Sequence, residues 1–197
     1  MSENNKNTQP ILSILICTIV GREDSYNALV LAIAKQIKEG GLQGQIEVLT
    51  SKDNRGQHTI GYKRNLLLQN CKGIYAMFVD DDDMLADGSL ILIINKLKTE
   101  NPDVVRLEGV LTTNGQNPQV FIHGLDIKEW YERGGVFYRP PNHLNPIRTS
   151  VSKNFRFPEI NHGEDMEWSM AICKAGVLRT ESNIGAAYYF YQYNSNK

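Results

Sequence analysis

Short apolar runs alternate with amphipathic segments along the first half of the chain. Runs rich in β-branched residues predict four buried strands, at 11–17, 46–49, 74–79 and 104–111. Between them, apolar residues at helical spacing predict three helices, at about 22–39, 61–71 and 90–98. Strand alternating with helix in this way predicts an α/β fold with a mostly parallel central sheet flanked by helices.

The rhythm changes after Thr112. A polar loop over 112–118 leads to a short strand at 120–122 and a brief helix around Trp130, at 126–132. A longer helix is predicted over 161–174, because Asn161 and Glu164 fit a capping box and Gly176 follows the last turn. The aromatic run at 188–191 predicts a late strand.

Length and charge narrow the choice of partners. The 197 residues predict a disordered tail over 1–10 and a single domain over 11–197. The formal net charge of −1 argues against a nucleic-acid surface. The longest apolar run, 11–20, is too short to span a bilayer, so we expect no integral membrane segment and a cytoplasmic location. The three separated cysteines suggest reduced core residues.

The third predicted strand ends in four consecutive carboxylates, Asp80 to Asp83. Neighbouring anions repel one another, and hard divalent cations such as Mg²⁺ or Mn²⁺ prefer oxygen ligands. Ligands of open α/β sheets bind at the carboxyl ends of strands, where these aspartates fall. A metal and phosphate site is one interpretation, and a solvated acidic turn before the next helix is the other. The spacing excludes a calcium EF-hand.

Five features in this order resemble the family-2 glycosyltransferases with the GT-A fold. They are Cys17-Thr18 after the first strand, Asp53 after the second, Lys63-Arg64-Asn65 in a helix, Asp80-Asp81-Asp82-Asp83, and Glu164-Asp165 at a late helix. The resemblance covers nearly all of 12–195. It implies a nucleotide-sugar-binding half over 11–111 and an acceptor-side half over 112–197.

The resemblance also implies roles for individual residues. It implies that a nucleoside diphosphate sugar, of the UDP type, is bound by Thr18, Asp53, Lys63, Arg64, Asp80 and Asp81. It implies a divalent cofactor, Mn²⁺ or Mg²⁺, held by Asp82 and Asp80. Asp165 is the expected general base, with Glu164 beside it, in an inverting transfer to a saccharide or glycoconjugate hydroxyl. Glu164 could instead serve only as a helix cap or complement the helix dipole.

Other interpretations remain open at this point. A non-catalytic module could keep the nucleotide-sugar pocket, and a sugar-1-phosphate nucleotidyltransferase uses a related fold. Residues 18–22 lack the glycine-rich loop that the latter needs. His143 is more readily a satisfied polar residue than a ligand, and His162 could line the acceptor side. The sequence predicts no oligomeric state.

Overall fold

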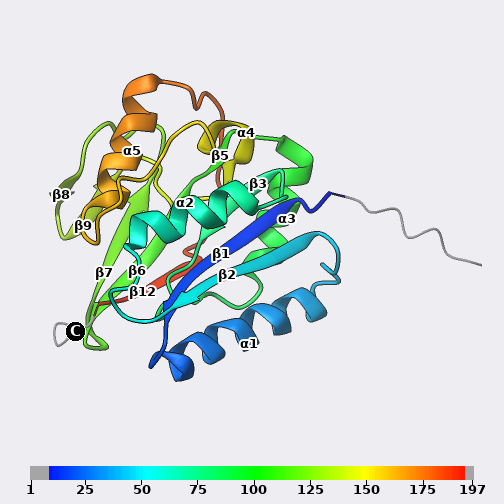
Figure 1. Cartoon of the computed structure of the whole chain (residues 1–197). Coiled ribbons are helices and arrows are strands. Elements are labelled where there is room, and N and C mark those ends of the chain that lie inside the picture. Colours follow the sequence, from blue (N-terminus) through cyan, green and yellow to red (C-terminus); the bar gives the residue numbers. More distant parts are fainter. Residues whose placement is uncertain (1–8, 194–197) are drawn as a thin grey trace, which may run out of the picture.

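The structure, a computed structural model, describes residues 9–193, which form two six-stranded sheets and five helices (Figure 1). The first sheet has the strand order β11-β5-β10-β3-β1-β2. Its strands are β1 (Leu12–Ile19), β2 (Ile46–Asp53), β3 (Tyr75–Phe78), β5 (Val104–Val105), β10 (Ile147–Arg148) and β11 (Glu181–Ser182). β10 runs antiparallel to its neighbours and the other pairings are parallel. The predicted mostly parallel central sheet is confirmed.

Strand β1 shows why the sheet is covered on both faces. Leu12, Ile14 and Ile16 pack into one cluster of buried residues, whereas Leu15 and Cys17 pack into the other. Successive side chains of a strand point to opposite faces, so the unbroken apolar run serves both. Residues of α1 (Glu23–Glu39) and α3 (Ser89–Glu100) belong to the first cluster. Residues of α2 (Ile60–Asn70) and α5 (Glu164–Ala175) belong to the second.

The sequence did not predict the second sheet, whose strand order is β4-β12-β6-β7-β9-β8. Its strands are β4 (Met84–Leu85), β6 (Leu107–Thr113), β7 (Gln116–His123), β8 (Tyr131–Arg133), β9 (Val136–Arg139) and β12 (Tyr189–Tyr193). One short helix, α4 (Thr149–Ser152), follows β10 directly. The aromatic strand predicted at 188–191 is β12, and it pairs with β4 and β6.

Two of the predicted secondary-structure elements are wrong. The single strand expected at 104–111 breaks at Arg106, so that β5 joins the first sheet and β6 the second. The guanidinium of Arg106 lies 2.7 Å from Asp126 and 3.2 Å from Glu181, which fixes the break between the sheets. The helix expected at 126–132 does not form: Ile127 closes a turn on the carbonyl of Gly124, and β8 follows.

The first eight and the last four residues of the chain lie outside the described residues. Residues 1–8 of the tail that we expected to be disordered lie outside them, while Gln9 Nε2 donates to the carbonyl of Lys72. The three thiols are free; Cys17 and Cys71 are buried as expected, and Cys173 is half-buried. Within residues 9–193, no helix combines the length and apolar character that crossing a bilayer requires.

Candidate functional site

The carboxyl ends of β1, β2 and β3 meet at one edge of the first sheet, as the parallel pairing requires. A cleft of about 470 Å³ opens beside the ends of β1 and β3. Arginines, carboxylates and aromatic residues from five segments line it, including Arg22, Arg64, Asp80, Asp81, Asp82, Glu164 and Tyr191. Cys17 also lines the cleft, but burial raises the pKa of its thiol to about 12, so it is not a thiolate nucleophile at neutral pH.

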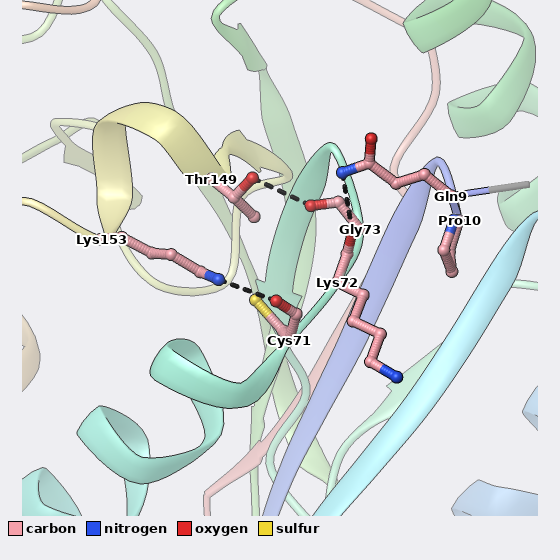
Figure 2. A pocket seen from close by; sticks show the side chains of 7 residues that line it. All are labelled: Gln9, Pro10, Cys71, Lys72, Gly73, Thr149 and Lys153. Carbon is pink, nitrogen blue, oxygen red and sulfur yellow. Dashed lines mark hydrogen bonds between the residues drawn. The ribbon is translucent and has the colours of Figure 1, made fainter.

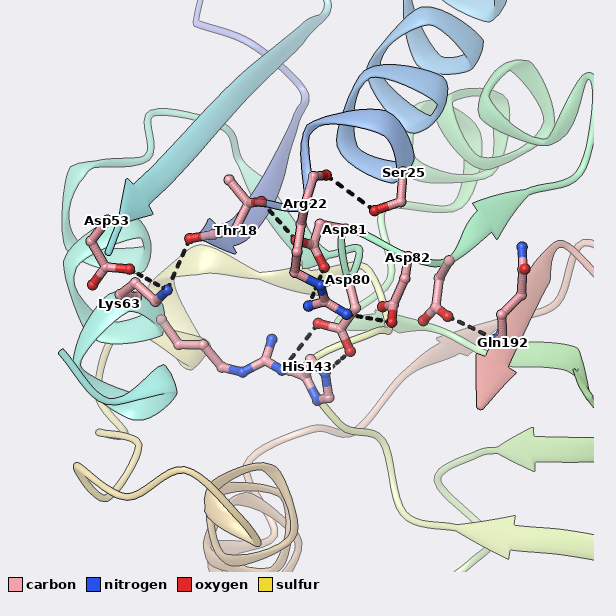
Figure 3. A network of polar contacts seen from close by, with 12 residues as sticks. Thr18, Arg22, Ser25, Asp53, Lys63, Asp80, Asp81, Asp82, His143 and Gln192 are labelled. Carbon is pink, nitrogen blue, oxygen red and sulfur yellow. Dashed lines mark hydrogen bonds and ion pairs between the residues drawn. The ribbon is translucent and has the colours of Figure 1, made fainter. Parts of the chain in front are cut away.

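Arg22 connects two of the four aspartates (Figure 3). Its Nη1 lies 2.7 Å from Asp81 Oδ1, and its Nη2 lies 2.6 Å from Asp82 Oδ2. The hydroxyl of Thr18 donates to the second oxygen of Asp81 at 2.6 Å. Burial raises the pKa of Asp81, and the contacts with Thr18 and Arg22 oppose that rise. Arg22 therefore supplies the cation for two of the four adjacent carboxylates.

Asp80 faces a different set of partners. Burial would raise the pKa of its carboxyl, but Arg64 and His143 outweigh that effect and hold the pKa well below the usual range. Arg64 Nη2 donates to Asp80 Oδ1 at 3.1 Å, and His143 Nε2 lies 3.9 Å from Asp80 Oδ2. Asp80 is therefore ionised across the physiological pH range.

Asp83 anchors the acidic loop to the second sheet. Its Oδ1 accepts from the backbone N–H of Gln192, and its Oδ2 accepts from the hydroxyl of Tyr189, both at 2.8 Å. Burial and the charge of Asp80 raise the pKa of Asp83 to about 8. Asp81 and Asp83 are each only 1% exposed, so the alternative of a solvated acidic turn is wrong for these two residues.

Asp53 and Lys63 form a buried pair at the end of β2. Lys63 Nζ donates to Asp53 Oδ1 at 2.8 Å and to the carbonyl of Thr18 at 3.0 Å. Burial raises the pKa of Asp53, but the contacts with Lys63 and His58 more than offset it, and the net shift is downward. Neither Asp53 nor Lys63 lines the cleft of 470 Å³. The structure thus places this pair behind Thr18, where it fixes the end of β1.

Arg64 joins the acidic loop to α5. Its Nε donates to Glu164 Oε1 at 3.2 Å, and its guanidinium lies 5.1 Å from the ring centre of Phe78. Nη1 is buried and has no hydrogen-bond partner among the described residues. Arg64 as a residue also lines the cleft, but Nη1 itself is buried and its hydrogen-bonding capacity is left unused.

The predicted capping box at Asn161 and Glu164 is wrong. Helix α5 begins at Glu164 after Gly163, whose φ of 82° lies in the left-handed region. Asn161 Oδ1 instead accepts from the backbone N–H of Ile60, at the start of α2. The carboxylate of Glu164 is thereby left for Arg64 rather than for its own helix end.

A second hollow, of about 230 Å³, adjoins the first. Asp165 and Arg139 line it, and it shares Arg64, Asp80, Asn161, His162, Glu164 and Tyr191 with the larger cleft. His143 is 5% exposed, and its Nδ1 lies 3.8 Å from Asp165 Oδ2. The two expected acidic centres, the end of β3 and the start of α5, thus face one another across the shared wall.

Sequence reasoning missed the role of Arg22 and undervalued His143. Arg22 was assigned only to the start of a helix, although an arginine is an unusual N-cap residue. The contacts of Tyr189 and Gln192 with Asp83 join positions more than 100 residues apart, and no local pattern reports them. Trp168 packs in the core, as expected, stacked 4.6 Å from Phe157.

A further hollow, of about 400 Å³, lies at the opposite edge of the sheet (Figure 2). Lys153 Nζ donates there to the carbonyl of Cys71 at 2.7 Å, and Thr149 Oγ1 donates to the carbonyl of Gly73 at 2.9 Å. The side chains that line it include no carboxylate. These contacts join the segment after α2 to α4 and the residue that follows it.

The comparison with protein families decides the affiliation of the chain. The model of "Glycosyl transferase family 2" matches residues 18–160, more than half of the sequence. The chain belongs to glycosyl transferase family 2. The match begins at Thr18, ends just before Asn161, and includes the four aspartates.

Solved structures support the same fold for this family 2 chain. S. aureus TarS 1-349 matches with a TM-score of 0.65 at 18% identity, covering 92% of this chain and 60% of that one. The same protein in complex with UDP matches with a TM-score of 0.64 at 20% identity, with the same coverages. Its complex with UDP-GlcNAc gives 0.63 at 19%, covering 92% and 58%. The α/β GT-A fold expected from the sequence is confirmed. A comparison with curated protein sequences gave no match.

Proposed function

We propose that this chain transfers a sugar from a nucleoside diphosphate sugar, of the UDP type, to a hydroxyl of a saccharide or glycoconjugate acceptor. Membership of family 2 supports a glycosyltransferase. The two TarS complexes are with UDP and UDP-GlcNAc, which favours a uridine donor here. The chain spans about 60% of the length of TarS 1-349. The acceptor class is therefore proposed for this chain and is not taken from that structure.

The observation that carries the proposal is the pair of adjoining hollows. The larger contains the acidic end of β3, and the smaller contains Asp165. A donor in the first would place its anomeric carbon at the shared wall, between Asp80 and Asp165. An acceptor in the second would then approach that carbon from the side opposite the diphosphate, which is the geometry of a single displacement with inversion.

The chemical step that follows needs one base. Asp165 accepts the proton of the acceptor hydroxyl while the hydroxyl oxygen forms a bond to the anomeric carbon. The bond between that carbon and the diphosphate oxygen breaks, and the nucleoside diphosphate leaves with the electron pair. Arg64 lines the cleft, and its guanidinium, which Glu164 holds in position, would interact with the donor diphosphate.

A divalent cation, Mn²⁺ or Mg²⁺, fits this site as a partner of the donor rather than as a resident ion. No group of three acidic, histidine or cysteine side chains among the described residues could hold a metal by itself. Mg²⁺ is commonly held by one or two carboxylates plus substrate phosphates, and Asp80 and Asp82 both line the cleft. When bound, the cation would neutralise charge that develops on the leaving diphosphate.

Thermal shift with a panel of nucleoside diphosphate sugars, with and without Mn²⁺, tests the proposal. A ligand that binds only the folded protein raises its melting temperature. We expect a shift with at least one UDP-sugar that grows when Mn²⁺ is added. No shift with any donor plus metal would contradict the donor assignment. Binding without slow hydrolysis of the donor would favour a non-catalytic module instead.

A further inference from the structure

The two cations that the sequence analysis expected to bind the diphosphate, Lys63 and Arg64, are mostly engaged in contacts within the protein. Lys63 is buried and bound to Asp53 and to the carbonyl of Thr18. Arg64 uses two of its nitrogens on Asp80 and Glu164. Arg22, by contrast, lines the cleft with a side chain that is 28% exposed. It is therefore the cation of this cleft that an entering ligand can reach.

An arginine at position 22 does not stabilise the start of helix α1. It is the N-cap of α1, where a short polar side chain usually accepts a hydrogen bond from the first turn, and its side chain makes no such bond. A cation there also opposes the helix dipole. Residues that break local rules without local benefit are typical of functional sites. The compensating contacts are those with Asp81 and Asp82.

The backbone under Arg22 is fixed, so that only the side chain is free to move. Its carbonyl accepts from the backbone N–H of Tyr26 at 3.1 Å and from the hydroxyl of Ser25 at 3.2 Å. Gly21 precedes it with a φ of 95°, a conformation that a residue with a side chain rarely adopts. Asp81 is held from its other side by Thr18. The contact between Arg22 Nη1 and Asp81 thus joins a held backbone segment to a held carboxylate.

The contact with Asp82 is of a different kind. Asp82 is 22% exposed in its side chain, and Nη2 of Arg22 lies 2.6 Å from its Oδ2. In the proposed function that carboxylate holds the divalent cation. A guanidinium and a metal ion compete for the same oxygen, because each needs its lone pairs and the two cations repel one another.

We propose that Arg22 is an exchangeable counter-ion of the donor cleft, an inference that rests on the proposed function. Without a donor, Arg22 neutralises Asp81 and Asp82. When the nucleoside diphosphate enters with its divalent cation, Nη2 leaves Asp82 and donates to a phosphate oxygen, while Nη1 stays on Asp81. The guanidinium fork suits this exchange, since it binds carboxylate and phosphate with similar geometry.

The exchange predicts opposite effects of one substitution on two ligands. In Arg22→Gln, the weak binding of Mn²⁺ in the absence of donor should become several-fold tighter, because its competitor for Asp82 is gone. UDP in the presence of Mn²⁺ should bind about tenfold more weakly, because a charge-assisted hydrogen bond to phosphate is lost. Electron paramagnetic resonance of free Mn²⁺ measures the first affinity, and isothermal titration the second.

Two further variants separate this role from general damage. Arg22→Lys keeps the charge without the fork, and it should bind UDP with an affinity between those of the wild type and Arg22→Gln. Lys52→Gln removes a nearby cation, one that pairs with Glu23 and does not line the cleft, and should change neither affinity. Melting temperatures of all variants show that they are folded.

The possible outcomes separate a failure of the Arg22 inference from a failure of the proposed glycosyltransferase function. If the wild type binds neither UDP nor GDP with Mn²⁺, the proposed function fails and this inference fails with it. If the wild type binds UDP and Arg22→Gln binds it equally well, the inference alone is wrong. An unchanged affinity of Arg22→Gln for Mn²⁺ would equally overturn it, since Arg22 would then not compete for Asp82.

Discussion

His143 Nδ1 lies 3.8 Å from Asp165 Oδ2, while Nε2 of the same ring lies 3.9 Å from Asp80 Oδ2. The imidazole therefore stands between the carboxylate at the end of β3 and the carboxylate at the start of α5. Its loop is held by buried amides: Asn145 Oδ1 accepts from the backbone N–H of Asn142, and Asn145 Nδ2 donates to the carbonyl of Val105. The buried ring fills the space between the two carboxylates, although neither of its nitrogens makes a hydrogen bond among the described residues.

Replacing His143 should therefore affect turnover more than donor binding. In His143→Ala, we expect kcat to fall by about 10- to 100-fold, because small displacements of a reacting group cost that much. Asp80 keeps Arg64, so the affinity for UDP should change little. His143→Gln retains an N–H donor and should recover part of the rate. Steady-state kinetics and titration with UDP measure the two effects, and a loss confined to UDP affinity would argue against this positioning role.

Asp165→Asn tests the base. The amide cannot accept the acceptor proton, so transfer should fall by about 10²- to 10⁴-fold while UDP binding stays close to wild type. Glu167→Gln is the matched control, because Glu167 lies in the same first turn of α5, is exposed, and lines neither hollow. Glycosyl transfer measured with a donor and acceptor pair checks both variants. Unchanged turnover in Asp165→Asn would remove it from the mechanism.

Elements with strong periodicity were predictable from the sequence. The helix expected over 22–39 is α1, which ends where Gly40 begins the turn, and the run at 74–79 contains β3. These segments carry their own signals, an amphipathic stripe or a buried apolar run. The acidic end of β3 was recognisable because four adjacent carboxylates need a counter-charge.

Features that depend on distant partners were not predictable. β10 and β11 have two residues each, and only pairing makes them strands: β10 pairs with β3 and β5, and β11 pairs with β5. Asn161 resembled a cap for its own helix, yet its side chain caps α2, 101 positions earlier in the chain. Arg22 was the exception, since a cation at an N-cap is a local signal that could have pointed to the carboxylates.

Gly61 controls how α2 meets the segment before α5. A Cβ at this position would lie 1.9 Å from the carbonyl oxygen of Pro158. Asn65 strengthens the same contact, because its side chain both donates to and accepts from the backbone of Phe157 at 2.9 Å. Gly61→Ala should therefore destabilise the protein by about 1–3 kcal/mol, although alanine favours helices.

Thermal unfolding checks this prediction, with Leu66→Ala as the control on the exposed side of the same helix. For a chain of this size, each kcal/mol lowers the melting temperature by roughly 2–4 °C. Gly61→Ala should melt several degrees below Leu66→Ala. Equal melting temperatures would mean that the segment at 158–159 moves away at little cost.

The contacts of Asp103 lead us to expect that the free energy of unfolding depends on pH. Its Oδ2 accepts from the backbone N–H groups of Arg179 and Thr180, at 2.8 and 3.0 Å. Burial raises the pKa of Asp103, but these bonds, with Thr180 Oγ1 and Arg148, outweigh it and lower the pKa below its usual value. A carboxyl with a depressed folded-state pKa stabilises the protein above its unfolded pKa of about 3.9 and loses that contribution as pH falls through the folded value.

The free energy of unfolding of wild type minus that of Asp103→Asn should therefore be largest near pH 6. There we expect about 1 kcal/mol, because the neutral amide oxygen can still accept one of the bonds, but without the charge. The difference should shrink as the pH is lowered below about 4, where Asp103 of the unfolded chain begins to be protonated while the folded-state carboxyl is still ionised. Urea unfolding at a series of pH values measures it, with Asp87→Asn as an exposed control that should change stability much less. A difference that stayed constant down to pH 2 would mean that the charge of Asp103 does not contribute, and that only the shape of its side chain matters.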